Sequence, residues 1–525
     1  MSEMSTTASS DQVQITGQHP LQCASKAAVA AVESPFKLGP LDELVFASVP
    51  IECVYVYEKP ELSPKDRFIS VERLRDALSY LLNYYPHLTG RLEFNSQTRA
   101  PEITHLRAGA ELLEAQCNAR LDDIASSDCD EDRILLTNLP DCGSALTPPF
   151  DSSMDAISRE PILAIQHTRF ACGGVALGIR LHHIVCDASG LFQLVRDLAE
   201  VYRGLSSSSR PTLASCPEIR SYLRDVSILS SEEQQNSLKY QPEAYHFEIG
   251  STASCPESTP ETTFESNPST KPPVTGRILN FSGDDLIELK KSAANPSGES
   301  FVSTFEALSA FLYQQIYRAR IQLLLSKGTS SSKAASKVFP GFGASINMRS
   351  HHRLNLPAKY FPNAIYPSFA TTSPEILTEG PLWKIASTLQ KQVRAIDAQQ
   401  MQQTARWIAM QPDKSRIRLN FTFADGNFTI NQWSGFGMYV GVDFDTDELG
   451  QPIPPALVSP PFTDMSRIDG LATILSTEEE IYRALEQNGS SQASKKPCAV
   501  DVNLTLSEPL WQILEADEQF GEYFY

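Results

Sequence analysis

The chain has 525 residues, more than one hydrophobic core usually supports, so its length predicts two domains. Its 44 Lys and Arg residues are outnumbered by 63 Asp and Glu residues, which gives a formal net charge of −19. A surface this acidic repels phosphate backbones and anionic lipids, so we expect no nucleic acid partner and no membrane insertion.

The cysteine pattern and the N-terminus indicate the compartment. The ten cysteines are scattered and include no C-x-x-C pair, which favours a reducing environment over a disulfide framework or a zinc cluster. The first twenty residues lack a basic stretch followed by an apolar one, and the apolar run at 27–32 is too short for a signal or a membrane span. We therefore expect a cytoplasmic protein.

The chain opens with a polar stretch before its first regular elements. Residues 1–34 are rich in Ser and Thr, and we expect a disordered tail there. The β-forming run at 51–57 predicts a strand. Apolar residues at helical spacing over 71–85 predict a helix that ends before a proline, and residues 88–94 turn into another strand.

The clearest pair of elements lies between residues 162 and 204. Two β-rich runs at 162–170 and 175–185 flank Cys172-Gly-Gly174, which predicts a hairpin. The stripe of apolar residues over 191–204 predicts an amphipathic helix, with Asp187 or Ser189 placed to cap it.

Composition changes after this helix. We expect an N-terminal domain over 35–215, an exposed crossover linker rich in Ser, Thr, Pro and Glu over 216–275, and a C-terminal domain over 276–525. Within the last of these, the patterns predict helices at 283–293, 304–325 and 507–518, a Ser/Lys-rich loop at 326–337, and strands at 418–423 and 500–506. Helices and strands are mixed in both halves, so the predicted class is α/β.

The string His182-His183-Ile-Val-Cys-Asp187 marks a candidate site where a strand becomes a turn. Strand residues two apart share a face, which places His183 with the apolar residues of its strand and His182 on the other face. Desolvation keeps such an imidazole neutral near pH 7, as a general base requires. Adjacent strand residues point in opposite directions, so we expect no metal site. The alternatives are a hydrogen-bonded core histidine and an Asp187 that only caps a helix.

Several co-linear segments extend this string into a family pattern. They are Tyr85-Pro-His-Leu-Thr-Gly-Arg-Leu92, the stretch around His183, Ser303-Thr-Phe-Glu-Ala307, Asn347-Met-Arg349 with Tyr360-Phe-Pro-Asn363, and Asp469-Gly-Leu-Ala-Thr-Ile-Leu475. From about residue 36 onward the chain resembles the BAHD family of plant and fungal acyltransferases, in a fungal-type form. One landmark differs: the family's D-F-G-W-G stands here as Asp443-Phe-Asp-Thr-Asp447.

The resemblance implies a fold and an activity. The fold would be two chloramphenicol-acetyltransferase-like domains with an inter-domain channel. The activity would be transfer of an acyl group from acyl-CoA, as co-substrate and with no bound cofactor, to a small-molecule alcohol or amine of secondary metabolism. We expect a monomer. The alternatives are a carrier-protein-dependent condensation enzyme and a non-catalytic small-molecule-binding protein of the same fold.

The resemblance also assigns roles to individual residues. It makes His183 the general base and pairs Asp187 with Arg349 as a structural motif. The remaining candidates are Asn431 as oxyanion donor, Ser303 and Thr304 at the CoA pocket, and Tyr55 and Tyr57 at the acceptor pocket. Each of these has a plainer interpretation, namely a polar turn residue, a helix cap, or packing inside a strand.

Overall fold

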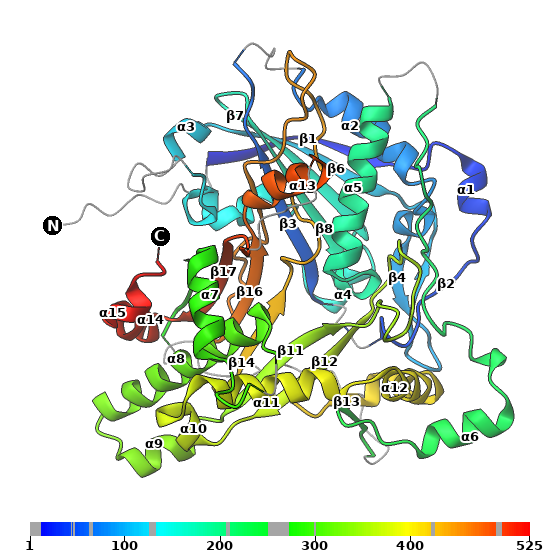
Figure 1. Ribbon diagram of the computed structural model, residues 1–525. Coiled ribbons are helices and arrows are strands. Elements are labelled where there is room, and N and C mark those ends of the chain that lie inside the picture. Colours follow the sequence, from blue (N-terminus) through cyan, green and yellow to red (C-terminus); the bar gives the residue numbers. More distant parts are fainter. Residues whose placement is uncertain are drawn as a thin grey trace.

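The structure is a computed structural model, and it describes residues 12–43, 45, 48–61, 67–124, 133–205, 210–249, 272–298, 301–421, 426–489 and 496–524. Two six-stranded β-sheets form its framework and lie one above the other in Figure 1. The first is built mainly from N-terminal strands and the second from C-terminal ones. The predicted mixed α/β fold with two sheet-rich halves is therefore confirmed.

The elements of the N-terminal half are the strands β1 (Val13–Leu21), β2 (Phe36–Lys37), β3 (Pro50–Tyr57), β4 (Arg91–Phe94), β5 (Pro101–Thr104), β6 (Ala110–Cys117), β7 (Leu163–Phe170) and β8 (Val175–His182), and the helices α1 (Lys26–Ala30), α2 (Val71–Leu81), α3 (Leu121–Ile124), α4 (Met154–Ile157) and α5 (Ala188–Gly204). Short 3-10 turns are η2 (Pro86–Thr89), η3 (Leu136–Asn138), η4 (Pro140–Leu146) and η5 (His183–Val185).

The elements of the C-terminal half are the strands β9 (Tyr245–Phe247), β10 (Val274–Phe281), β11 (Gly341–Asn347), β12 (Ile365–Thr371), β13 (Ile417–Leu419), β14 (Phe428–Gln432), β15 (Leu457–Ser459), β16 (Leu471–Ser476) and β17 (Val500–Ser507), and the helices α6 (Ser231–Lys239), α7 (Gly283–Ser292), α8 (Thr304–Ser326), α9 (Ser331–Lys337), α10 (Pro374–Glu379), α11 (Leu382–Ala395), α12 (Ala398–Met410), α13 (Glu479–Gly489), α14 (Glu508–Glu515) and α15 (Glu518–Gly521). Its 3-10 turns are η6 (Val226–Ile228) and η7 (Lys414–Arg416).

The first sheet has the strand order β1-β6-β7-β8-β3-β15, and all its neighbours run antiparallel except β6 and β7. Helices α2 and α5 pack against each other and bury their apolar stripes on one face of this sheet. The other face is covered by η3, η4 and residues of the C-terminal half. Every residue of β8 is buried as a result, which places the end of this strand inside the molecule.

One glycine of β8 marks how tightly the second face is covered. A Cβ at Gly178 would lie 2.0 Å from the carbonyl oxygen of Leu146 in η4. No larger residue fits there without moving the backbone, so glycine allows η4 to press directly on the strand.

The second sheet has the order β10-β17-β16-β14-β11-β12, with parallel pairs at β16–β14 and β14–β11. Helix α8 lies in the core of this half and packs against α7, α10, α11 and α14. The predicted elements at 51–57, 162–170, 283–293, 304–325 and 500–506 are all present, with small shifts at their ends.

Three predictions about the chain differ from the structure. The predicted tail at 1–34 is wrong for residues 13–21, which form β1 at the edge of the first sheet, while residues 1–11 lie outside the described part. Most side chains of β1 face solvent, so the strand has no apolar pattern and is held by backbone pairing with β6. The predicted loop at 326–337 contains helix α9, and the predicted linker at 216–275, whose sequence shows one modest helix pattern, carries α6 and in addition the short strand β9.

Strand β15 departs from a simple division into two halves. It belongs to the C-terminal stretch of the chain, yet it pairs with β3 as the last strand of the first sheet. The chain then returns to the second sheet through residues 460–470. This crossing brings a C-terminal loop beside the strands that carry the candidate site.

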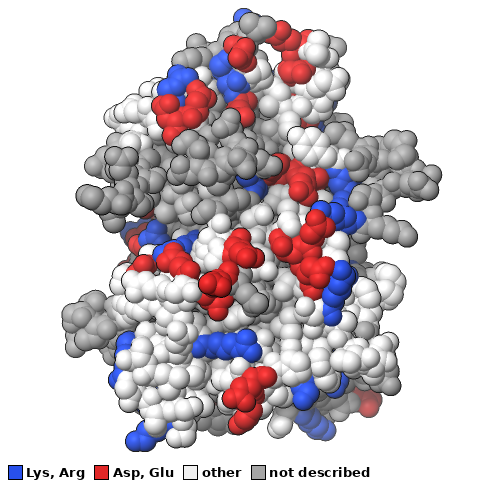
Figure 2. All heavy atoms as spheres, turned by 60° about the vertical axis from the view of Figure 1, so that its left-hand side comes forward, with Lys and Arg blue, Asp and Glu red and all other residues white. Residues whose placement is uncertain are grey.

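The described surface carries both acidic and basic side chains. On the face shown in Figure 2, acidic and basic side chains are interspersed among neutral ones over the described surface, without a continuous basic area. None of the helices in the described ranges is long and apolar enough to cross a membrane.

Candidate active site

His183 lies at the point where β8 ends. The strand was predicted to continue to Val185, but it stops at His182, and His183 begins the 3-10 turn η5. The backbone N–H of His183 donates to the carbonyl of Val49 at 3.2 Å. The turn is short because Asp187 already caps α5, accepting a hydrogen bond from the N–H of Gly190 at 3.3 Å.

The surroundings of His183 keep its imidazole uncharged. Burial lowers the pKa of His183 below its usual 6.5, although the charge of Asp187 and the side chain of Asn363 act in the opposite direction. Among the described residues the buried Nδ1 has no hydrogen-bond partner, whereas the residue as a whole is partly exposed. A neutral imidazole can accept a proton at its unprotonated ring nitrogen, as a general base requires.

Asp187 is directed at the second half of the chain. Its carboxylate receives two hydrogen bonds of 2.8 Å from the guanidinium of Arg349 and a third, also 2.8 Å, from the N–H of Ala364. The side chains are only 4% and 12% exposed for Asp187 and Arg349, so this is a buried bidentate pair. The same guanidinium donates to the carbonyls of Tyr360 and Pro362. The pair thus joins the start of α5 to the segment at 360–364.

A second buried carboxylate holds the same segment and was missed by the sequence analysis. Asp42 is fully buried and accepts hydrogen bonds from the backbone N–H and the side-chain amide of Asn363, at 3.0 and 3.1 Å. The Asn363 amide also donates to the carbonyl of His183 at 3.0 Å. Asn363 lies in the Tyr-Phe-Pro-Asn segment quoted above, but nothing local in the sequence indicates its contact with Asp42.

Burial raises the pKa of Asp42 to about 6, while hydrogen bonds from Ser221, Gly39 and Asn363 act against the rise. A carboxyl with this pKa is mostly ionised at neutral pH. It can then accept from the three N–H groups of Gly39 and Asn363 that surround it.

The other residues assigned by resemblance lie in different surroundings. Asn431 is partly exposed in β14, on the opposite side of the strand from the buried Ile430, and its side chain has no hydrogen-bond partner among the described residues. Ser303 caps α8 in a reciprocal box with Glu306, so the plainer reading of Ser303 and Thr304 as a helix start has direct support.

Tyr55 and Tyr57 are both fully buried in β3. The hydroxyl of Tyr57 donates to the carbonyl of Val442 at 2.7 Å, so it is used in joining the first sheet to a C-terminal loop. Burial raises the pKa of both tyrosines well above the usual value.

The altered D-F-G-W-G stretch is well anchored. Asp445, at the position of the family's first glycine, accepts hydrogen bonds from the N–H of Ile69 at 2.7 Å and from Arg73 at 3.2 Å. Asp443 pairs with Arg203 at 3.1 Å, and the buried Phe444 packs edge-on against Tyr202. Asp445 therefore binds this stretch to α2 through Arg73 and to the residues just before that helix through Ile69.

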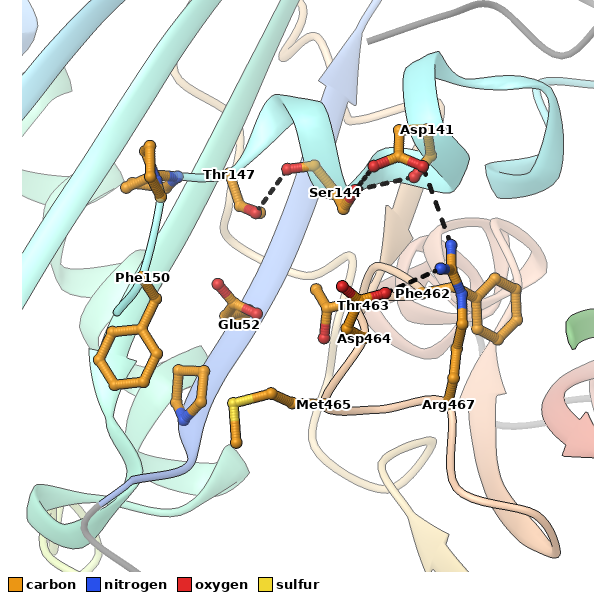
Figure 3. Close-up of a pocket in the computed structure, with 13 residues that line it drawn as sticks. Glu52, Asp141, Ser144, Thr147, Phe150, Phe462, Thr463, Asp464, Met465 and Arg467 are labelled. Carbon is orange, nitrogen blue, oxygen red and sulfur yellow. Dashed lines mark hydrogen bonds and ion pairs between the residues drawn. The ribbon is translucent and has the colours of Figure 1, made fainter. Parts of the chain in front are cut away.

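A cavity of about 240 Å³ opens beside β3 (Figure 3). Its walls come from the start of β3, from η4 and the stretch that follows it, and from the loop after β15. The lining residues are Pro50, Glu52, Asp141, Ser144, Thr147, Pro148, Pro149, Phe150, Phe462, Thr463, Asp464, Met465 and Arg467. Pro50 pairs with His182 across the strands, so one wall of the cavity borders the backbone next to His183.

Comparisons with known proteins agree with this architecture. A sequence profile described as "Transferase family" matches residues 22–466. The hydroxycinnamoyl-CoA:piscidic acid hydroxycinnamoyltransferase of Actaea racemosa is 25% identical over 400 residues, covering 73% of this chain and 78% of that protein. Among the described residues, no group of three or more His, Cys, Asp or Glu is placed to hold a metal ion.

Two crystal structures show the same fold. Vinorine synthase superposes with a TM-score of 0.63 at 15% identity and covers 98% of both chains. TRI101 of F. sporotrichioides, complexed with coenzyme A and T-2, has a TM-score of 0.62 at 18% identity and covers 93% of this chain and 98% of its own. The profile match spans most of the chain, and we conclude that the protein is an acyltransferase of this transferase family, the BAHD acyltransferases.

Proposed function

We propose that the protein transfers an acyl group from an acyl-CoA thioester to a small-molecule alcohol or amine of secondary metabolism, with His183 as the general base. The observation that carries the proposal is the state of His183, a partly exposed residue whose pKa is lowered by burial so that its ring is neutral, while Asp187 is paired with Arg349. The name of the Actaea relative, which specifies a CoA donor, and the coenzyme A in the TRI101 complex support this donor.

The chemistry requires one proton to move twice. Nε2 of His183 takes the proton from the acceptor hydroxyl or amine as its oxygen or nitrogen attacks the thioester carbonyl. The carbon–sulfur bond of the tetrahedral intermediate then breaks, and the CoA thiolate receives the proton from the imidazolium. The products are the ester or amide and free CoA, with no acyl-enzyme.

The supporting residues have separate roles in this proposal. Asn431 donates to the oxyanion, and its amide has no competing partner among the described residues. Ser303 and Thr304 contribute to the CoA pocket, and Tyr55 and Tyr57 border the acceptor side. Asp187, Arg349, Asp42 and Asn363 position the turn that carries His183 and exchange no proton with substrate. We further propose a fungal-type enzyme that works as a cytoplasmic monomer.

The test is release of free thiol together with the mass of the product. Purified protein is incubated with acetyl-CoA or a longer acyl-CoA and a pool of alcohols and amines, and a parallel reaction offers the acyl group on a carrier protein. We expect thiol release that depends on the acceptor, and a product heavier by one acyl group. Transfer only from the carrier protein, or tight binding of acceptors without any turnover, would support one of the two alternatives instead.

A further inference from the structure

The side-chain amide of Asn363 has only one orientation that its contacts allow. Its nitrogen Nδ2 lies 3.1 Å from Oδ1 of Asp42 and 3.0 Å from the backbone carbonyl oxygen of His183. A carbonyl oxygen only accepts hydrogen bonds, and so does an ionised carboxylate. The NH2 group therefore occupies this position, with one hydrogen for each oxygen, because the flipped amide would set its own oxygen against two acceptors.

This orientation leaves the amide oxygen of Asn363 without a donor. The residue is fully buried, and its Oδ1 has no hydrogen-bond partner within the described ranges. Buried polar atoms of folded proteins are almost always paired, so an unpaired acceptor at this place indicates a donor nearby.

His183 carries a matching unpaired atom. Its Nδ1 is also buried and has no hydrogen-bond partner in the part of the chain that the structure describes. The side chain of Asn363, which already contacts the backbone of His183, acts by hydrogen bonding to raise the pKa of the His183 ring against the effect of burial. A side chain has this effect when it accepts a hydrogen bond from the ring, which Oδ1 can do and Nδ2 cannot.

The other groups around the ring favour a donor at the same nitrogen. The backbone carbonyls of His183 and Cys186 also act to raise the pKa of His183 by hydrogen bonding, and Asp187 at the start of α5 acts to raise it through its charge. Each of these groups attracts a ring N–H, and none of them donates a hydrogen bond to a bare ring nitrogen. A buried imidazole nitrogen that faces acceptors is more stable with its hydrogen than without it.

We propose that Oδ1 of Asn363 accepts the hydrogen of Nδ1 in His183, which makes Asn363 the positioning residue that fixes the tautomer of the base. Nδ1 keeps its hydrogen throughout the reaction, and Nε2 is the nitrogen that takes the proton of the acceptor and returns it to the CoA thiolate. Asp42 acts one step further out, because its carboxylate holds Nδ2 and so turns Oδ1 toward the ring. The part in catalysis rests on the proposed function, whereas the tautomer is a property of the resting protein.

The tautomer is measured directly and without turnover. The full-length protein is labelled with nitrogen-15 in its histidines only, and the signals of His183 are identified among the nine histidines by their loss in His183→Ala. Nitrogen chemical shifts and couplings to the ring hydrogens at pH 8 distinguish a protonated ring nitrogen from a bare one. We expect the hydrogen on Nδ1 and none on Nε2. A hydrogen on Nε2 of the wild-type protein would overturn the proposal, and this measurement needs no change at Asn363.

Two variants test what Asn363 contributes to the base. Asn363→Leu keeps the approximate size of the side chain and removes its acceptor and its donors. Asn503→Leu is the matched control, because Asn503 is also buried, has an unpaired Oδ1 within the described ranges and donates through Nδ2 to Ser459 and Pro460. It lies in β17 of the second sheet.

The pH profile of turnover reports the effect on His183. Without the acceptor at Asn363 the pKa of His183 falls further, so the acid midpoint of kcat/KM should move to lower pH in Asn363→Leu. We expect kcat above pH 7 to fall about tenfold, a part of what general base catalysis contributes, while KM for the acyl-CoA changes less than about twofold. Asn503→Leu should leave the midpoint where it is. An unmoved midpoint in Asn363→Leu, with a melting temperature like that of the wild type, would refute the role of Asn363.

The two measurements separate this inference from the proposed function. A hydrogen on Nδ1 in a protein that releases no thiol from any acyl-CoA would count against the acyl transfer alone. Thiol release that depends on His183, in a protein with the hydrogen on Nε2, would count against the role of Asn363 alone.

Discussion

At the residue scale, His183 combines two properties that usually conflict. Burial lowers the pKa of its ring, which stays uncharged at neutral pH, yet the residue as a whole is partly exposed. The turn at the end of β8 reconciles them, because it moves His183 out of the fully buried strand while the preceding His182 stays inside, edge-on to Phe150. Proton transfer at a neutral ring nitrogen is the chemistry that this position allows.

The pH dependence of turnover follows from the lowered pKa of His183. The base works only when neutral, so kcat/KM with an alcohol acceptor should fall on the acid side with a midpoint below 6.5 and stay level above it. Initial rates of thiol release across pH 5–8 would measure this. Thermal melts at each pH would identify any loss that comes from unfolding. A midpoint at or above 6.5 in folded protein would contradict the burial of the ring as described here.

At the element scale, the strand–turn–helix unit from β8 to α5 is held by one segment of the other half. Asp187 accepts hydrogen bonds from Arg349 and from the N–H of Ala364 in this segment. The side-chain amide of Asn363, in the same segment, donates to Asp42 and to the carbonyl of His183. Two separate carboxylates thus fix the same segment against the same turn. The turn that carries His183 is positioned by long-range contacts, and its own short sequence could not fix it alone.

Removing one partner of the buried pair should therefore destabilise the protein. Arg349→Ala leaves the Asp187 carboxylate buried without its cation, at a cost of about 3–5 kcal/mol in the free energy of unfolding by urea. The control is Lys291→Ala in α7, whose pair with Glu288 is exposed, with an expected cost below about 0.5 kcal/mol. If Arg349→Ala unfolds like the control, the pair does not hold the site together.

The candidate site was predictable from the sequence only where its residues are close together. His183 and Asp187 stand four apart in a strand-then-helix pattern, so local periodicity and the family resemblance both indicate them. Asp42 and Asn363 are 321 residues apart, and no periodicity reports such a contact.

Elements without an apolar pattern were missed in the same way. Strand β1 is stabilised by its backbone ladder with β6, and most of its side chains are exposed. Helix α9 has the sequence SSKAASK, in which Ala334 is the buried residue, and so it gave no amphipathic signal. Long elements such as β8 and α5 were predicted correctly because their buried apolar residues recur along the sequence in the pattern of a strand or a helix.

At the scale of the whole molecule, the two halves are joined by contacts that neither could make alone. Strand β15 completes the first sheet from the C-terminal part of the chain. Its Ser459 accepts a hydrogen bond from Asn503 of β17 in the second sheet at 3.0 Å. Arg133 pairs with Asp501 of the same strand at 2.8 Å. The two sheets are therefore tied to each other by side-chain contacts as well as by the chain that links them.

These ties predict that the two halves unfold together. Urea unfolding followed by tryptophan fluorescence and by far-UV circular dichroism should give coincident transitions. The tryptophans lie in the C-terminal half, at 383, 407, 433 and 511, while circular dichroism reports both sheets. Two transitions that separate clearly between the probes would show that the halves are independently stable.

The central claim, that the His183 imidazole carries the proton, is tested most directly by the rate of thiol release from acyl-CoA in His183→Ala. The variant should fold like the wild type and lose about 100- to 10,000-fold in kcat, while His352→Ala, at an exposed histidine, keeps its rate. A folded His183→Ala protein that releases thiol at the wild-type rate would contradict the account.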